Sequence, residues 1–404
     1  MRKMFATVLA VALSFSFAAS AADAPGNKAA SKRPYPKHEL DASWPKQFPN
    51  NMIMGDPAGV AVDPATDHVW IFSRQRSVNP EYLGLTKSPP TSRCCTYMPA
   101  VAEFDAEGNY VQGWGGPMTP TADAGAYEWP EGEHGITVDY KGNVWICGYV
   151  NNRDAKIDDN HCLKFTKDGR FLLQIGKKNG SKGSLDTENL NHATKVVVSP
   201  KTNEAFIADG YVNRRVIVVD AETGKYKRMW GAYGNKPDDS APRDRTFDGP
   251  PPQQFNNVHG IELSNDGMVY VNDRQNNRVQ VFDTQGKFIK EAFILRDTKS
   301  SFGTSFSLAF SADKEQRFVY VADLANFAVH VLDRQSMEMI PEASFGHAGP
   351  YPGQFLRLHL LASDTKGNIY TSEANGGKIN KWVFKGLSQS VSYTHLTLPT
   401  NREV

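Results

Sequence analysis

Apolar and polar residues follow one pattern six times along this chain. Each copy has a short apolar run, a turn with glycine, a second run ending in a polar or small residue, a polar link, a third run and a fourth that ends near glycine. Two copies show the pattern plainly: HGITVDYKGNVWICGY from His134 and HGIELSNDGMVYVNDRQNNRVQVFDTQGKFIKEAF from His259. Such runs, without a long amphipathic helical stretch, predict an all-β repeat protein.

The other four copies keep the same frame. They read AGVAVDPATDHVWIFSR, ATKVVVSPKTNEAFIADGYVNRRVIVVDAETGKYKRMWG, SFSLAFSADKEQRFVYVADLANFAVHVLD and HLLASDTKGNIYTSEANGGKINKWVF. Units of roughly 40 to 65 residues with four strands each favour propeller blades over a sandwich, because radial repetition protects the strand edges. The sequence therefore predicts a six-bladed β-propeller with four-stranded blades, whose innermost strands line a central channel.

One position of the repeat carries histidine in every second copy. The second, fourth and sixth copies have His134, His259 and His359 there, and the first, third and fifth have Ala58, Thr194 and Phe306. Alternate blades of a six-bladed ring lie a third of a turn apart, so the three imidazoles are expected to converge on the channel axis. Three neutral imidazoles leave one tetrahedral position open, as in catalytic zinc sites. The simpler alternative is that these histidines only hydrogen-bond water.

Composition and charge narrow the class of protein. The 404-residue chain is 40% hydrophobic and 22% charged with a formal net charge of +1, which excludes a disordered chain and a protein directed at nucleic acid. Its 33 glycines and 24 prolines suit a turn-rich β structure. A closed ring is one cooperative unit, so we expect a single propeller domain over residues 41–387, acting as a monomer.

The first residues resemble a signal peptide. A basic start precedes an apolar run from Phe5 to Ala18 and an Ala-Ser-Ala cleavage site. We expect residues 1–21 to be removed and residues 22–40 to form a flexible leader. The apolar run is too short to remain in a membrane, which predicts export to the periplasm or the exterior without stable membrane insertion.

The other end of the chain also lies outside the predicted fold. Residues 391–404 read VSYTHLTLPTNREV and resemble a translated sequencing adapter, so we treat residues 388–404, with His395, as an artefact. The sixth copy shows three apolar runs and no fourth. Propellers commonly close their last blade with a strand from the opposite terminus, and the segment from Trp44 to Ile53 is the predicted donor.

The four cysteines fall into two pairs. Cys147 ends the second run of its copy and Cys162 opens the third, so they could face each other and form a disulfide, or the 14-residue link could hold them apart. Cys94 and Cys95 are adjacent, and a bridge between neighbours is uncommon. The segment from Arg76 to Pro99 that carries them interrupts the first copy and is expected to cover the channel mouth.

The glycine-x-x-Val-Asp starts and the string DRQNNRVQVFD, from Asp273 to Asp283, resemble NHL repeats. The whole region from Ala58 to Phe384 resembles the six-bladed propeller of peptidyl-α-hydroxyglycine α-amidating lyase. That resemblance implies one zinc ion on the propeller axis, bound by His134, His259 and His359. A site with three histidines and an open position also accepts other divalent ions.

The same resemblance implies three catalytic residues: Arg74 in VWIFSR, Tyr211 in ADGYVNRR and Arg274 in VNDRQNNR. It implies that zinc binds the α-hydroxyl of the substrate, Tyr211 takes its proton, and the C–N bond breaks to release an amide and glyoxylate. Phenol is a poor base near neutral pH, and flanking guanidinium charge favours the phenolate. Arg274 could also form a fork with the substrate carboxylate. Alternatively, the arginines form inter-blade ion pairs and the tyrosine is an ordinary turn aromatic.

Two positions depart from the family. Leu360 stands where the family has an aspartate ligand of a structural calcium ion, so Ca²⁺ is not expected there, and Val212 replaces a disulfide cysteine. Two hypotheses follow. The first is a zinc lyase acting on a small peptidyl-α-hydroxyglycine or a similar N-acyl hemiaminal. The second is a non-catalytic NHL propeller that binds a protein or glycan partner in the cell envelope.

Overall fold

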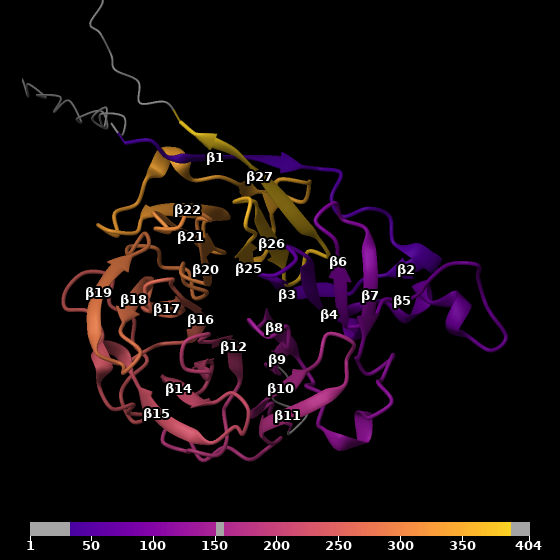
Figure 1. Ribbon diagram of the computed structural model, residues 1–404, viewed down its shortest axis with the longest axis horizontal. Helices are drawn as coiled ribbons and strands as arrows, with labels where there is room; N and C mark the ends of the chain where they lie inside the picture. The colour runs from indigo at the N-terminus through magenta and orange to yellow at the C-terminus, as the bar shows by residue number, and fades with distance from the viewer. Residues whose placement is uncertain (1–32, 151–156, 389–404) are drawn as a thin grey trace, which may run out of the picture.

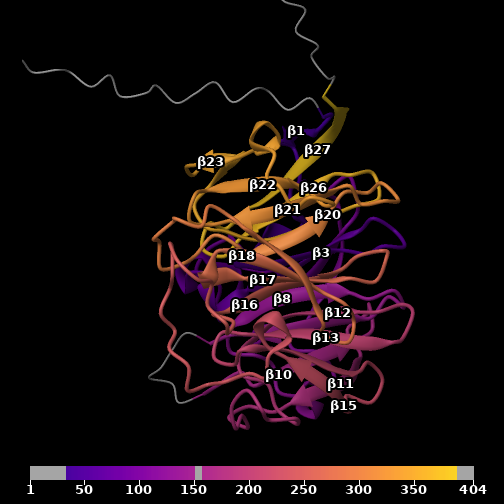
Figure 2. The same cartoon turned by 90° about the vertical axis from the view of Figure 1, so that its left-hand side faces the viewer.

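The repeating strands form a closed ring of six blades around a central channel (Figure 1). The computed structural model describes residues 33–150 and 157–388. Neighbouring strands within a blade are antiparallel, and Figure 2 shows the blades stacked in a view turned by 90°. The prediction of an all-β, six-bladed propeller is confirmed.

Five blades are four-stranded sheets. The first contains β3 (Asp56–Val62), β4 (Val69–Arg74), β6 (Val101–Phe104) and β7 (Tyr110–Trp114). The second contains β8 (Glu133–Val138), β9 (Val144–Gly148), β10 (His161–Phe165) and β11 (Phe171–Gly176). The third contains β12 (Ala193–Val198), β13 (Glu204–Asp209), β14 (Arg215–Asp220) and β15 (Tyr226–Trp230), and the fourth β16 (Val258–Leu263), β17 (Val269–Asp273), β18 (Arg278–Phe282) and β19 (Phe288–Phe293).

The last two blades differ from this plan. The fifth has three strands, β20 (Ser307–Phe310), β21 (Phe318–Asp323) and β22 (Ala328–Asp333). In place of a fourth strand, isolated bridges join β22 to Phe345 and Met339. The sixth is four-stranded and combines β25 (Leu358–Ser363), β26 (Ile369–Glu373) and β27 (Ile379–Leu387) with β1 (Pro36–Asp41).

Short elements connect the blades. Two parallel pairs join β2 (Met52–Ile53) to β5 (Thr96–Tyr97) and β23 (His347–Ala348) to β24 (Gln354–Phe355). The helices of the described residues are single 3₁₀ turns: η1 (Pro49–Asn51), η2 (Gln75–Ser77), η3 (Pro80–Tyr82), η4 (Gly84–Thr86), η5 (Ala124–Ala126), η7 (Ala232–Gly234), η8 (Arg274–Asn276) and η9 (Pro341–Ala343). None of them has the length and apolar character needed to cross a membrane.

Apolar side chains fill the spaces between blades. Successive residues of a strand point to opposite faces of its sheet, so each apolar face meets the facing side of the next blade. The buried residues form six clusters, one between each pair of neighbouring blades. The cluster between the sixth and first blades, for example, joins Tyr370 and Ile379 to Val60 and Ile71. Continuous packing around the ring fixes the inner strands at the channel.

An N-terminal strand closes the ring, as predicted, but it is a different segment from the predicted one. β1 pairs antiparallel with β27, with Leu40 opposite Trp382. Residues 36–40, which were expected in the leader, therefore belong to the propeller. The expected donor lies elsewhere: Trp44 is buried against Tyr370, their rings 5.1 Å apart, and Ile53 pairs with Tyr97. The signal peptide, residues 22–32 of the leader and residues 389–404 lie outside the described residues.

Both cysteine pairs are bridged. Cys147 and Cys162 lie directly opposite each other on β9 and β10, with Cα atoms 4.3 Å apart, so the link between them does not separate the strands. Cys94 and Cys95 form the second bridge. Their segment lies at the outer edge of the ring (Figure 1), where β5 pairs with β2, and within it Arg76 alone lines the cavity at the channel mouth. The expectation that this segment covers the mouth is therefore wrong.

The closing strand makes stability depend on pH. The pKa of His38 on β1 is lowered to about 4, mainly by burial, although its hydrogen bond to the carbonyl of Gly367 acts in the other direction. A histidine in the unfolded chain has a pKa near 6.5, so the unfolded state takes up the proton first as the pH falls. We expect His38 to account for a loss of about 2 kcal/mol in the free energy of unfolding between pH 7 and pH 4.5.

Urea unfolding of the parent and of His38→Phe at both pH values measures this contribution. The phenyl ring keeps the contacts with Tyr320 and Phe384, whose ring centroids lie 5.3 and 5.7 Å from that of His38. The variant should lose less stability on acidification than the parent. An identical pH dependence in the two proteins would show that His38 does not carry the effect.

Candidate metal centre

Three buried histidines meet on the axis of the channel. His134, His259 and His359 are 0%, 0% and 4% exposed, and their ring centroids lie 4.6, 4.8 and 4.9 Å apart. One potential ligand nitrogen from each lies within 4.8 Å of the others. Among the described residues, these three histidines form the one group of at least three histidine, cysteine or acidic side chains that could hold a metal ion. The structure thus brings together the three positions that the repeat register singled out.

A β-bulge turns each of these positions toward the axis. Across His134 in β8, His259 in β16 and His359 in β25, the pairing with the second strand of the blade shifts register. The same shift occurs at Ala58 in β3 and Thr194 in β12. A bulge adds a residue to one strand and takes that residue out of the ladder of backbone hydrogen bonds. The carbonyl group of that residue is therefore available for other partners.

These carbonyl groups orient the imidazoles. Each histidine donates from Nδ1 to the carbonyl oxygen at the same repeat position of the next blade, which is never a histidine. The pairs are His134 with Thr194 (3.1 Å), His259 with Phe306 (2.8 Å) and His359 with Ala58 (2.6 Å). A carbonyl oxygen can only accept, so Nδ1 carries the proton and Nε2 keeps its lone pair free for a ligand.

The three histidine Nε2 atoms offer more lone pairs than there are hydrogen-bond donors to satisfy them. Burial lowers the pKa of His134 and His259 well below the usual value, and burial together with the charge of Arg74 lowers that of His359 to about 3. The hydroxyl of Tyr211 lies 3.1 Å from Nε2 of His134 and 3.0 Å from Nε2 of His259. It has one proton and can donate to only one of them at a time. A buried cluster with this surplus of acceptors fits a cation.

Tyr211 is held at the metal-facing end of the cavity. Nη1 of Arg274 donates to its hydroxyl at 3.2 Å, and the ring stacks on Tyr149 with centroids 3.6 Å apart. Arg274 is fixed in turn, because Nε donates to the carbonyl of Phe302 at 2.7 Å and the guanidinium lies 4.5 Å from the centroid of the Phe306 ring. The phenol therefore touches two of the histidines and one cation at once.

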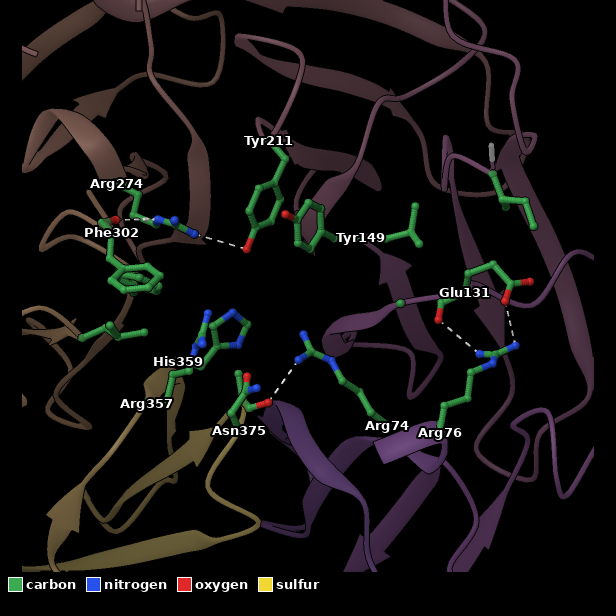
Figure 3. A pocket seen from close by; sticks show the side chains of 16 residues that line it. Arg74, Arg76, Glu131, Tyr149, Tyr211, Arg274, Phe302, Arg357, His359 and Asn375 are labelled. Atoms are coloured by element: carbon green, nitrogen blue, oxygen red, sulfur yellow. Dashed lines mark hydrogen bonds and ion pairs between the residues drawn. The ribbon is translucent and has the colours of Figure 1, made fainter. Parts of the chain in front are cut away.

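Arg74 reaches the same cavity from the first blade. Its guanidinium donates to the carbonyls of Glu133 and Ala374, both at 3.0 Å. Its charge also contributes to the lowered pKa of His359. Figure 3 shows Arg74, Tyr211 and Arg274 pointing into one cavity beside His359. The structure thus brings all three predicted catalytic residues to the same mouth of the channel.

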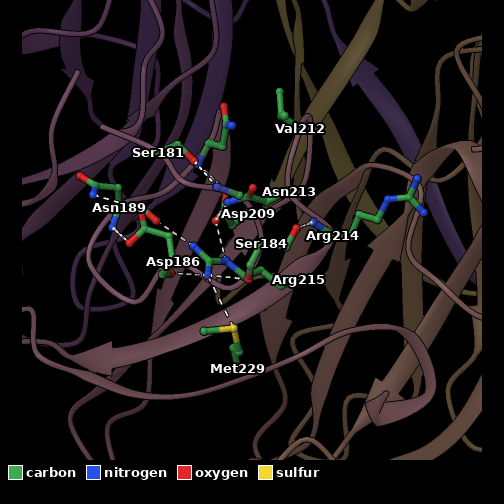
Figure 4. A network of polar contacts seen from close by, with 12 residues as sticks. Ser181, Ser184, Asp186, Asn189, Asp209, Val212, Asn213, Arg214, Arg215 and Met229 are labelled. Carbon is green, nitrogen blue, oxygen red and sulfur yellow. Dashed lines mark hydrogen bonds and ion pairs between the residues drawn. The ribbon is translucent and has the colours of Figure 1, made fainter. Parts of the chain in front are cut away.

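Two fully buried ion pairs involve other arginines, and each lies within one blade, not between blades as was considered for Arg74 and Arg274. Arg215 pairs with Asp209, and Arg278 pairs with Asp273, each at 2.8 Å with both side chains fully buried. In Figure 4, Asp209 and Arg215 lie at the centre of a polar network. Asp209 immediately precedes the Gly-Tyr pair that presents Tyr211, so this network anchors the loop that carries Tyr211. Neither Arg74 nor Arg274 forms an ion pair among the described residues.

The cavity has a volume of about 550 Å³. Every blade contributes to its lining with a residue at or just after the end of its second strand: Arg74, Tyr149, Tyr211, Arg274, Leu324 and Ala374. Tyr149 was missed from the sequence although the repeat register points to this position. Arg357, two residues before the third histidine, was also missed, because nothing in its immediate sequence distinguishes it from a solvent-exposed arginine.

Known proteins resemble this chain, although no family model matches it. It is 23% identical over 369 residues to peptidyl-glycine alpha-amidating monooxygenase A of Xenopus laevis, a match that covers 86% of this chain and 33% of that protein. It is 24% identical over 387 residues to peptidyl-alpha-hydroxyglycine alpha-amidating lyase 1 of Drosophila melanogaster, covering 87% of this chain and 60% of the lyase. NHL repeat-containing protein 3 of Homo sapiens is 24% identical over 351 residues, covering 86% and 84%.

The chain spans about a third of the length of the amidating monooxygenase it matches. Among solved structures, a streptogramin B lyase aligns with a TM-score of 0.46 at 12% identity, covering 86% of this chain and 98% of that one. The sequence matches and the ring of six blades together describe an NHL-repeat propeller that resembles peptidyl-α-hydroxyglycine α-amidating lyase.

Proposed function

We propose that this protein is a zinc-dependent lyase that cleaves the C–N bond of a peptidyl-α-hydroxyglycine or a similar N-acyl hemiaminal. One observation carries the proposal: the Tyr211 hydroxyl lies within hydrogen-bonding distance of the Nε2 atoms of His134 and His259 and of the Arg274 guanidinium. A base at the position of the Tyr211 hydroxyl would contact the hydroxyl of a substrate bound at the three histidines. The match to a Drosophila amidating lyase supports the same reaction.

His134, His259 and His359 would hold the metal through Nε2, because Nδ1 of each is already committed to a carbonyl. Zinc bound by three imidazoles supplies a Lewis acid that polarises a substrate oxygen and favours loss of its proton. The histidines need not lose a proton to bind it, since burial keeps them neutral.

The side chains around the centre account for the proton transfer. Tyr211 accepts the proton of the α-hydroxyl, and the electron pair left on oxygen forms the carbonyl of glyoxylate as the C–N bond breaks. The bonding pair leaves with nitrogen, which takes a proton to become the amide, so the step is redox-neutral. Arg274 donates a charged hydrogen bond to the oxygen of Tyr211 and holds it beside the three histidines. Arg74 adds positive charge on the wall of the cavity that faces Tyr211.

We further propose that the protein works as an exported monomer on a small substrate, in the periplasm or outside the cell. The buried bridge between Cys147 and Cys162 supports an oxidising compartment, because such bonds are rare where thiols are kept reduced.

The metal requirement can be tested by elemental analysis after dialysis. We expect about one zinc ion per parent chain and a loss of more than about 100-fold in zinc affinity for His259→Ala, since removing a ligand costs more than the 10- to 100-fold of an outer partner. His347→Ala is the matched control, because His347 is exposed and lies outside the cluster. A folded parent that binds no divalent metal, and whose His134→Ala variant behaves identically, would favour the non-catalytic propeller.

The proposed base can be tested by glyoxylate release from α-hydroxyhippurate. Tyr211→Phe should lower kcat by at least about 100-fold, since it removes the group that accepts the proton. The variant should still bind one metal ion, because Tyr211 is not one of the three ligands. Tyr140→Phe loses the same oxygen from an exposed position and should retain full activity. Wild-type turnover by Tyr211→Phe would rule this residue out as the base.

A further inference from the structure

Four arginines line the cavity, and three of them are engaged. Arg76 forms ion pairs with Glu131 at 2.9 Å and Glu133 at 3.6 Å. Arg74 donates to two backbone carbonyls, as described above. Arg274 uses Nε and Nη1 for the carbonyl of Phe302 and the hydroxyl of Tyr211. Each fork that Nη2 of Arg274 could form with Nε or Nη1 therefore includes a nitrogen that is already engaged, which disfavours the fork with a substrate carboxylate considered from the sequence.

Arg357 is the fourth arginine and differs from the other three. Its guanidinium forms no hydrogen bond or ion pair with any described residue, and its one side-chain contact of note is with the ring of Phe302, 5.1 Å from the centroid. Its backbone, in contrast, is fixed: the amide donates to Glu373 at 3.0 Å, and the carbonyl accepts from Ala374 at 3.1 Å. A rigid backbone therefore presents an uncommitted, half-buried guanidinium to the cavity (Figure 3).

The position of Arg357 ties it to the metal centre. It lies two residues before His359, directly before strand β25, and both side chains line the same cavity. Burial is the main cause of the lowered pKa of Arg274, and the charge of Arg357 adds to it, so the two cations act on one another. Asp56 also lies within the field of Arg357 but forms no ion pair with it in the described structure. The cavity thus holds a cation near the metal position without an anionic partner.

We propose that Arg357 binds the carboxylate of the substrate and makes the site selective for α-hydroxy acids over their neutral amides. The inference rests on the proposed function and identifies the group that selects the substrate. In an α-hydroxy acid the carboxylate is attached to the carbon that bears the hydroxyl. A substrate whose hydroxyl lies at the three histidines must therefore place its carboxylate close to them. Arg357 offers a planar pair of donors that matches a carboxylate, and no group of residues 33–150 or 157–388 competes for them.

Binding of an unreactive analogue tests the proposal without relying on catalysis. Mandelate has the α-hydroxyl and the carboxylate but no C–N bond to break, and mandelamide replaces the carboxylate by a neutral amide. Calorimetric titration of the zinc-loaded full chain should show at least about tenfold tighter binding of mandelate than of mandelamide. Arg357→Gln should weaken mandelate binding by about 10- to 100-fold, the range for a hydrogen bond to a charged group, and leave mandelamide binding unchanged.

Two further variants separate a specific contact from general charge. Arg357→Lys keeps the charge but loses the fork and should fall between the parent and Arg357→Gln. Arg76→Gln removes a charge from another side of the same cavity, where it already has acidic partners, and should change mandelate affinity by less than about threefold. Thermal unfolding shows whether each variant is folded.

The outcomes are distinct from those that test the lyase. Unchanged mandelate binding by a folded Arg357→Gln, or equal weakening of both ligands, would overturn the assignment of Arg357. If α-hydroxyhippurate is cleaved, Arg357→Gln should raise KM much more than it lowers kcat. If the parent releases no glyoxylate but the binding pattern holds, the lyase proposal fails while the carboxylate site stands.

Discussion

Hydrogen bonds from imidazole Nδ1 atoms to backbone carbonyls of the next blade hold the centre of this molecule together. They leave three lone pairs directed at one axis, and each of them also joins one blade to its neighbour. The acceptor is in every case the residue that occupies the histidine position in the following copy. Each imidazole thus depends on the backbone carbonyl of a neighbouring copy that itself carries no histidine.

The bulges at Ala58 and Thr194 explain how a sheet provides two of these three acceptors. In an unbroken strand the carbonyls at these positions would be used in the ladder, and the side chains would follow the pleat. The register shift at Ala58 frees its carbonyl for His359, and the shift at His359 turns that ring toward the channel. Packing between the blades then fixes the Ala58 carbonyl and the His359 ring in place. The metal-facing geometry is consequently set by the rigid parts of the fold, with little left to loop motion.

The sequence was sufficient for the fold, the repeat register and the convergence of the histidines, because all three depend on the periodicity of side-chain types. It was insufficient for features that depend on backbone groups. Nothing in the residue types of Thr194 or Phe306 indicates that their carbonyls orient a ligand. The closing strand, PKHELD, was missed because Leu40 is the one aliphatic residue among its inward positions Pro36, His38 and Leu40, whereas the richer segment at Trp44 looked more like a strand. Arg357 could be recognised as a candidate only once the partners of the other cavity arginines were known.

The arginines show two different solutions to the cost of burying charge. Arg215 and Arg278 are fully buried, and each is neutralised by an aspartate at 2.8 Å. Arg74 and Arg274 also lose much of their hydration, but carbonyl and hydroxyl dipoles solvate them in place of carboxylates. Dipoles stabilise a guanidinium without cancelling its charge, so the positive potential remains in the cavity. A neutral ligand gains little from such a field, whereas an anion gains from every uncompensated cation. The arrangement therefore favours a ligand that brings its own negative charge into the cavity.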